Sequence, residues 1–248
     1  MKKAIITIGS IVFLGIVVIL FMFLTDSGPF NKIAINEEVS FSANVVELVD
    51  VKTDVGNVHV KTHQSDEFLV SFTGQTKSLD RRKLQLTAEV DGDTLVVRGK
   101  QPANRSIFNI RPTTYEVEVL VPESEFTELS IRSDVAEISI VDANVGKMEL
   151  YSAVGNIDVK SIANDAEIIT DVGDITLDLV MIYADIKAHS SVGDINVLFE
   201  ELPDELQYTV ETEVGRRQYD VLKNIPQSDQ APTLMLKTEV GSISVTNE

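Results

Sequence analysis

One short pattern recurs along the chain at nearly even intervals: a small hydroxyl residue, any residue, then Val-Gly. Seven copies can be aligned on the valine, at 49–60, 129–140, 148–159, 166–177, 186–197, 208–219 and 234–245. The valines of the last six copies are 19, 18, 20, 22 and 26 residues apart. A period near 20 residues is too short for a propeller blade and suits one coil of a solenoid. We therefore predict an all-β fold, a β-solenoid resembling a parallel β-helix, with coils of 18–26 residues.

The columns of this alignment predict how each coil is built. Positions six and four before the valine are mostly apolar, and position two before it is always Ser or Thr. With the valine, these positions share one face of a strand, so we expect all of them to point inward. After the glycine the apolar positions shift by an odd number, which requires a bend in the backbone. Stacked coils would then place the inward hydroxyls in a ladder, bonded to one another or to the corner amides.

Glycine suits such a corner because it reaches positive φ without a Cβ penalty. The corner glycines predicted on this basis are Gly56, Gly155, Gly173, Gly193, Gly215 and Gly241. Two copies depart from the pattern. Ala136 replaces the glycine in 129–140, and Arg216 and Arg217 replace the usual residues after the glycine in 208–219. We expect those two coils to be irregular.

The N-terminus predicts a membrane anchor. Residues 4–24 contain no charge and are long enough to cross roughly 30 Å of hydrocarbon at 1.5 Å per residue. Lys2 and Lys3 precede this run, which places the N-terminus in the cytoplasm. A cleaved signal peptide is the alternative, but its apolar core is shorter and a cleavage site is lacking. The predicted divisions are a cytoplasmic stub at 1–3, a transmembrane helix at 4–24, a linker at 25–44 and an extracytoplasmic solenoid domain at 45–248.

Composition narrows the classes of partner. The chain carries a formal charge of −18 and no cysteine. The absence of cysteine excludes a disulfide framework, a thiolate nucleophile and a Cys-based zinc site. The acidic balance argues against nucleic-acid binding and against adhesion to anionic lipid by charge alone. An envelope protein or a cationic peptide attracted by this charge is the expected partner.

Carboxylates lie beside the predicted corners, and they are the candidates for chemistry. They are Asp54, Asp134, Asp171, Glu213 and Glu239 before the valine, and Asp174 and Asp194 after the glycine. Carboxylates stacked in this way repel unless compensated, so Asp171, Asp174 and Asp194 are candidate Ca²⁺ ligands. Ala153 and Ser191 interrupt the column, however, and the Gly-Gly-x-Gly-x-Asp signature of calcium solenoids is absent. We expect solvated carboxylates, with no metal and no cofactor.

The same carboxylates recur with the repeat and do not form one singular cluster, so we predict a protein that is not an enzyme. The alternative is a protein that binds or processes cell-wall polysaccharide through these acidic corner residues. Two basic segments, 77–83 and 104–114, are predicted to be loops, and the second is expected to fold over an open end of the solenoid. Nothing follows the copy at 234–245 that could cover its strand, which predicts an open edge suited to edge-to-edge self-association.

Several stretches carry a family resemblance. They are "TYEVEVLVPES" leading into "ELSIRS", the serial "TDVGDI" and "SSVGDI" segments, and "LFEELPDELQYTVETEVG". Over about 45–248 the chain resembles the bacterial putative-adhesin family, a β-solenoid domain of unknown function. With the N-terminal anchor, the layout is similar to that of membrane-anchored members tied to a cell-envelope stress system. The resemblance implies a surface interaction module for adhesion or envelope stress, and it supplies no catalytic residues.

Overall fold

The computed structural model describes residues 32–77, 84–101, 114–160 and 164–248. The predicted stub, the predicted transmembrane helix at 4–24 and the first part of the linker lie outside these residues. So does most of each basic segment, at 78–83 and 102–113. Within the described ranges, no helix is long and apolar enough to cross a bilayer.

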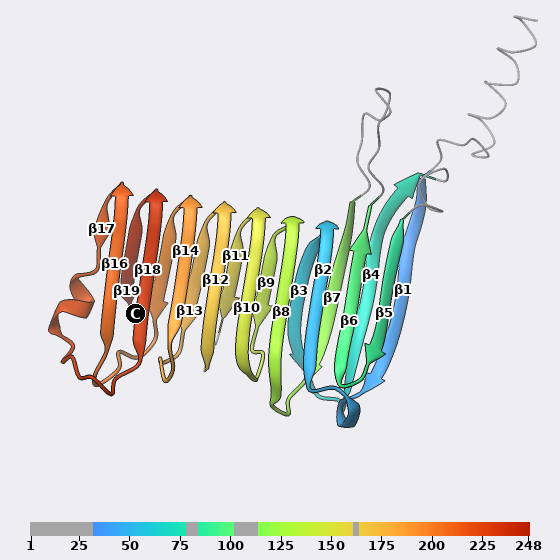
Figure 1. Cartoon of the computed structure of the whole chain (residues 1–248), viewed down its shortest axis with the longest axis horizontal. Helices are drawn as coiled ribbons and strands as arrows, with labels where there is room; N and C mark the ends of the chain where they lie inside the picture. Colours follow the sequence, from blue (N-terminus) through green and yellow to red (C-terminus); the bar gives the residue numbers. More distant parts are fainter. Residues whose placement is uncertain (1–31, 78–83, 102–113, 161–163) are drawn as a thin grey trace, which may run out of the picture.

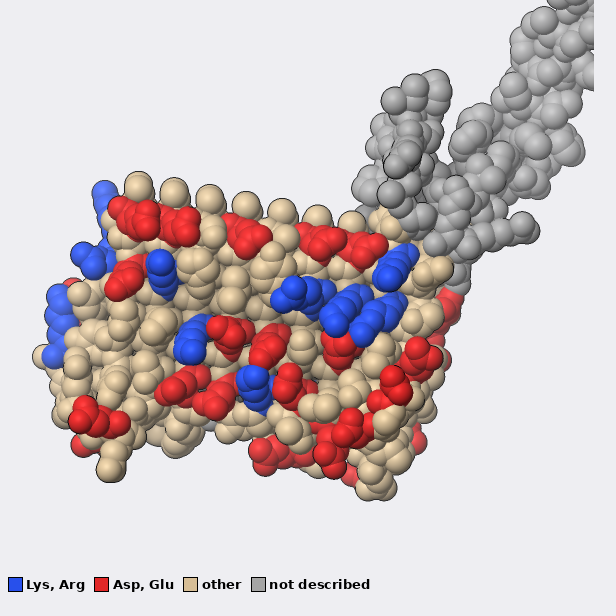
Figure 2. All heavy atoms as spheres, viewed as in Figure 1, with Lys and Arg blue, Asp and Glu red and all other residues tan. Residues whose placement is uncertain are grey.

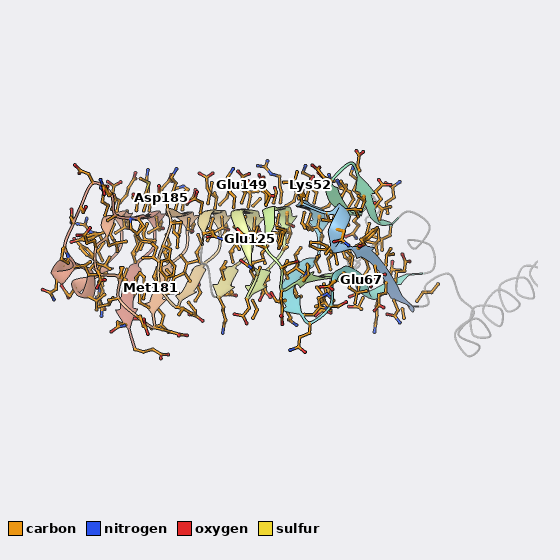
Figure 3. The ribbon with its side chains drawn as sticks, turned by 90° about the horizontal axis from the view of Figure 1, so that it is seen from below. Lys52, Glu67, Glu125, Glu149, Met181 and Asp185 are labelled. Atoms are coloured by element: carbon orange, nitrogen blue, oxygen red, sulfur yellow. The ribbon has the colours of Figure 1, made fainter. Side chains whose placement is uncertain are left out.

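The described strands form two sheets that face each other across one core (Figures 1 and 3). In spatial order, the ten-stranded sheet contains β1 (Lys32–Ser42), β4 (Glu67–Lys77), β7 (Thr114–Pro122), β3 (Asn57–His63), β9 (Ile138–Val141), β11 (Ile157–Lys160), β13 (Ile175–Leu179), β15 (Ile195–Phe199), β19 (Ile243–Asn247) and β17 (Arg217–Gln218). The nine-stranded sheet contains β16 (Gln207–Val214), β18 (Thr233–Val240), β14 (Ile186–Val192), β12 (Asp165–Val172), β10 (Val145–Val154), β8 (Phe126–Val135), β2 (Leu48–Val55), β6 (Thr94–Lys100) and β5 (Gln85–Asp91). Two short 3-10 helices, η1 (Ala43–Val45) and η2 (Asp220–Asn224), complete the described elements.

Each of the seven sequence copies forms one coil: a strand of the nine-stranded sheet, a corner, and a strand of the ten-stranded sheet. Neighbouring coils are parallel and in register, so that Leu150 lies beside Ile168 and Ser152 beside Thr170. The all-β, solenoid-like prediction is therefore confirmed. The coil with Ala136 is also regular, because β8 pairs in register with both β2 and β10. The prediction that it would be irregular was wrong.

The coils are not stacked in the order of the sequence. The last coil, β18 and β19, lies between the coil β14–β15 and the coil β16–β17 (Figure 1). The prediction of an open edge at the last coil was therefore wrong, since β19 pairs with β15 on one side and with β17 on the other. Within the described residues, the outermost strand at this end of the nine-stranded sheet is β16.

The coil at 208–219 is irregular, as predicted, and it ends the stack. Strand β17 pairs with β19 through only two residues, Arg217 and Gln218. The chain then turns into η2, which packs beside β19 and buries Leu222 completely. This short helix covers the apolar end of the core, where the rest of a strand would otherwise have run.

The other end is closed by antiparallel strands. Strand β1 pairs with β4 along its whole length, and β4 pairs with β7. The linker predicted at 25–44 is therefore wrong from Lys32 onward, because these residues are part of the sheet. Between Ile33 and Ser42 of β1 only Ile35 is buried, although Ile33, Val39 and Phe41 stand at alternate positions with it. Phe68 of β4 packs edge-to-face on Phe126 at 5.6 Å between ring centroids and closes the core.

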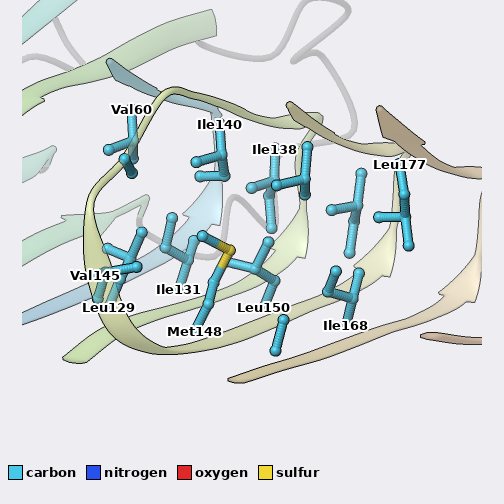
Figure 4. Packing of buried hydrophobic residues seen from close by; sticks show 14 of the residues in the cluster. Val60, Leu129, Ile131, Ile138, Ile140, Val145, Met148, Leu150, Ile168 and Leu177 are labelled. Carbon is cyan, nitrogen blue, oxygen red and sulfur yellow. The ribbon is translucent and has the colours of Figure 1, made fainter. Parts of the chain in front are cut away.

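Between the sheets, the buried side chains form one continuous apolar layer (Figure 4). Leu150 and Ile168 come from the nine-stranded sheet, and Ile138, Ile140 and Leu177 come from the ten-stranded sheet. Every coil adds its own apolar pairs to this layer, so the buried area grows with the number of coils. The long stack can thus be stabilised without disulfides.

The predicted corner glycines all have φ values between 144° and 157°. Two constraints favour glycine at these six corners. First, residues that have a side chain rarely adopt this backbone conformation. Second, a Cβ on Gly173 would overlap the carbonyl oxygen of Gly155 in the neighbouring coil. The backbone at Ala136 does not have a positive φ, so the first constraint does not apply there. Among the described residues, Asp142 is the one non-glycine residue with positive φ.

We expect Gly173→Ala to lower the free energy of unfolding by more than about 2 kcal/mol, because it combines backbone strain with a clash against the Gly155 carbonyl. Gly92→Ala is the matched control. Gly92 also has positive φ, in the turn between β5 and β6, but an added Cβ there meets nothing within 4 Å. It should cost only about 1 kcal/mol. Urea denaturation of the full chain, followed by circular dichroism, gives both values, and equal losses would contradict the role assigned to the corner.

Candidate functional site

The corners are where the coils are joined, and the inward hydroxyls make the first set of bonds. Five of the seven donate to the carbonyl oxygen of the corner residue in an adjacent coil. The pairs are Ser152 to Ala136 (2.9 Å), Thr170 to Gly155 (3.0 Å), Ser190 to Gly173 (2.9 Å), Thr238 to Gly193 (2.9 Å) and Thr212 to Gly241 (2.8 Å). The predicted ladder is thus present, but its acceptors are carbonyls and not amides. Only Thr53 and Ser133 bond hydroxyl to hydroxyl, at 2.9 Å.

An aromatic side chain ends this ladder at β6. There the position in register with Thr53 is Gly99, which has no hydroxyl. Tyr115 reaches across from β7, with its ring against Gly56 and its hydroxyl against Gly99, so a Cβ on either glycine would overlap it. Burial raises the pKa of Tyr115 well above its ordinary value, and the nearby carboxylate of Asp54 raises it further.

The residue after the corner glycine makes a second set of bonds. Its side-chain oxygen accepts the backbone N–H of the equivalent residue in the next coil. These bonds run from Glu137 N–H to Asn57 (3.1 Å), from Asp174 N–H to Asn156 (2.9 Å), from Asp194 N–H to Asp174 (2.8 Å) and from Ser242 N–H to Asp194 (2.7 Å). Asp174 and Asp194 therefore each hold a neighbouring coil in place with one carboxylate oxygen.

The structure does not gather the three candidate metal ligands around one point. Asp174 and Asp194 lie in the ladder after the glycines, whereas the carboxylate of Asp171 accepts a hydrogen bond from the Tyr151 hydroxyl at 2.8 Å. That bond raises the pKa of Tyr151. In the ranges that the structure describes, no group of three or more His, Cys, Asp or Glu side chains is arranged to hold a metal ion.

Substitutions at Asp174 separate a structural role from metal binding. Asn has the same side-chain oxygen and occupies this column naturally at Asn57 and Asn156, so Asp174→Asn should leave stability nearly unchanged. Asp174→Ala removes the acceptor for Asp194 N–H and should cost about 0.5–1.5 kcal/mol. Urea denaturation with and without added Ca²⁺ measures both effects. A calcium-dependent stabilisation that Asp174→Asn abolishes would contradict the structural role.

The valine of each copy does not point inward, and that prediction was wrong. Val135, Val154, Val172, Val192 and Val240 are 45–48% exposed, and Val214 is 63% exposed. Pairing between coils skips the residue before the valine, as in Ser152–Thr170 followed by Val154–Val172. The backbone therefore turns one step before the glycine and places the valine on the outside. These six valines and Val55 are in register on neighbouring strands, and together they form what we term the corner ridge.

Carboxylates flank the corner ridge on both sides. Asp54, Asp134, Asp171, Glu239 and Glu213 precede the valines, and they form the upper row of acidic side chains in Figure 2. Glu137, Asp174 and Asp194 follow the glycines. The two columns of the seven coils contain eight carboxylates and one basic residue, Arg216. We term the two columns the acidic rows. The result is an apolar line between two lines of negative charge.

A group of basic side chains lies on the outer face of the nine-stranded sheet (Figure 2). Arg98, Lys52 and Arg132 are in register on β6, β2 and β8. Asp50 forms ion pairs with Arg98 (2.6 Å) and with Lys52 (3.2 Å), and the Arg132 guanidinium lies 4.8 Å from the centre of the Tyr151 ring. Our sequence analysis missed this cluster. The signal was present, because Lys52 and Arg132 stand at the same position of their sequence copies, three residues before the valine.

A depression of about 490 Å³ adjoins one end of the corner ridge. Its walls are the corners at Gly56, Ala136 and Gly155, together with Gly74 of β4 and Tyr115 of β7. Val55, Val135 and Val154 of the corner ridge also line it. The surface that repeats along the whole stack is the corner ridge with its acidic rows, and this surface is the candidate functional site.

A family model matches the chain twice, at residues 46–197 and 125–247, and the two matches together span the solenoid. The chain belongs to the Toastrack DUF4097 family. Both matches include 125–197, as expected where a family model is itself built from similar coils. None of the curated protein sequences is similar enough to the chain to count as a match.

Comparison with solved structures gives the following likenesses. A crystal structure of a putative cell adhesion protein from Clostridium sporogenes is 14% identical, with a TM-score of 0.53 over 87% of this chain and 100% of that one. A putative adhesin from Bacteroides fragilis is also 14% identical, with a TM-score of 0.42 over 86% of this chain and 97% of that one. At these identities the first likeness shows that the fold is shared, and nothing more.

Proposed function

We propose that the chain is a membrane-anchored module that works outside the cytoplasm by binding a partner of the cell envelope, and not by catalysis. The observation that carries this proposal is the corner ridge with its acidic rows. The valine repeats in register on seven neighbouring coils, and carboxylates occupy eight of the fourteen positions in the two flanking columns, which suits recognition of an elongated partner. An active site would instead require one singular arrangement of catalytic groups.

Further support comes from the family and the charge. The Clostridium sporogenes neighbour is described as a putative cell adhesion protein, and this description supports surface binding as the proposed function. The charge of −18 favours association with cationic partners and opposes contact with anionic lipid. The apolar run at 4–24 would anchor the module, with the solenoid outside the membrane. A role in adhesion or in the envelope stress response follows from this placement.

The topology is tested on protoplasts that express the full chain. If the N-terminus is cytoplasmic and the solenoid external, protease added outside should remove a tag placed after Glu248 and leave a tag placed before Met1 intact. Detergent lysis before digestion is the control, because it should expose both tags. Survival of the C-terminal tag on intact protoplasts would overturn the proposed location.

The class of partner is tested with the full chain in nanodiscs, incubated separately with isolated cell wall and with detergent-solubilised membrane. We expect capture from the membrane fraction that weakens when two acids of the corner are neutralised by Asp134→Asn and Asp171→Asn. Neutralising Asp158 and Glu167, two exposed acids away from the corner, should leave that capture unchanged.

Retention on isolated wall that Asp174→Ala and Asp194→Ala abolish would instead support the rival function, binding or processing of wall polysaccharide. Each chain must first pass the stability measurement above, so that loss of fold is not mistaken for loss of binding.

A further inference from the structure

We propose that the corner ridge is the docking site for a cationic amphipathic α-helix, which lies along the stack with its apolar stripe on the valines. This inference rests on the proposed function, in that the chain works by binding. It goes further, because it assigns the contact surface, the secondary structure of the partner and its charge.

The spacing of the ridge favours a helix over an extended chain. Neighbouring coils are about 4.8 Å apart, so the seven valines form a line about 29 Å long. Side chains on one face of an α-helix repeat about every 5.4 Å, which differs from the coil spacing by about 0.6 Å at each step. Side chains on one face of an extended strand repeat about every 6.7 Å, a difference of about 2 Å at each step. A helix of about 20 residues would cover the whole ridge.

The cross-section of the surface also matches an amphipathic helix. The ridge is narrow, one valine wide, and each of its valines other than Val55 is about half exposed or more. The acidic rows run beside it, one at the ends of strands of the nine-stranded sheet and the other in the corners that follow. A helix with a narrow apolar stripe and Lys or Arg on both flanks would bury its stripe on the valines and place its cations over the carboxylates.

Charge excludes two other occupants. A second copy of the chain, docked ridge to ridge, would bring its acidic rows against those of the first, and like charges would oppose the contact. An anionic lipid surface would be repelled in the same way. The partner is therefore a cationic helix and not another molecule of this protein.

The test uses the full chain in nanodiscs of zwitterionic lipid, with empty nanodiscs as the blank. The probe is a fluorescent peptide of about 20 residues made of leucine and lysine, with leucine at the first and fourth positions of each heptad. One comparison peptide has the same composition, but its leucines stand at every second position of a central segment flanked by lysines, which favours an extended amphipathic chain. The other replaces lysine by glutamate. We expect the helical cationic peptide to bind at least tenfold more tightly than either.

Two pairs of matched variants locate the contact. Val154→Thr with Val172→Thr keeps the shape of the ridge but removes apolar surface, and it should weaken binding of the helical peptide about tenfold. Val39→Thr with Val180→Thr makes the same change at exposed valines away from the ridge and should have less than a twofold effect. The neutralised corner acids, Asp134→Asn with Asp171→Asn, should weaken binding and flatten its salt dependence more than Asp158→Asn with Glu167→Gln.

Equal binding of the helical and alternating peptides would overturn the inference, as would equal losses from the ridge variants and their controls. If the full chain still captures a membrane partner by way of its corner acids while the peptide tests give those results, the proposed function stands and only the helical partner is wrong. If that capture also fails, the proposed function is wrong as well.

Discussion

Each regular coil is attached to its neighbour by a hydroxyl that donates to a backbone carbonyl at the corner. This bond brings the carbonyl so close to the next coil that only a glycine fits beside it, as Gly173 fits beside the carbonyl of Gly155. The residue after the glycine then supplies a second bond, such as the one from Asp194 N–H to Asp174. Because both bonds recur from coil to coil, the side chains on the outer surface of the corner are spaced at the distance between neighbouring coils. The corner ridge and the acidic rows are consequences of the bonds that hold the stack together.

The repeated motif was enough to predict the coils, the corner glycines and the ladder of hydroxyls. It was not enough to predict the order of the coils in space. In a parallel stack every coil presents the same pattern of apolar and hydroxyl positions to its neighbour. Strand β18 can therefore pair with β14 as well as β16 could. The one signal was the long interval between Val214 and Val240, which contains η2 and the turn that follows it. Strand β1 was missed although Ile33, Ile35, Val39 and Phe41 stand at alternate positions along it, because Glu37 interrupts the pattern.

The candidate site was predicted only in part. The positions of the carboxylates followed from the alignment, but their roles did not, because a side chain that bonds the next coil and one that faces water have the same spacing. The parity argument also assumed an extended strand up to the glycine. The backbone turns one residue earlier, and this small difference moves Val172 from the core to the surface. The contact of Arg132 with Tyr151 was within reach of the alignment, because the two residues share one column of adjacent copies, three positions before the valine.

The insertion of the last coil has a consequence for the way the protein is made. A chain that is synthesised from its N-terminus presents β14 and β15 before any neighbour is available for their outer edges. The strands β16 and β17, which come next, belong one place further along, so the vacant place must wait for residues 233–247. The stack therefore cannot grow in sequence order near its end. The final strands, β18 and β19, insert between the coil β14–β15 and the coil β16–β17 and pair with both. Until synthesis is complete, strand edges on both sides of that gap keep unpaired N–H and C=O groups. During this interval a chaperone or another nascent chain could bind them.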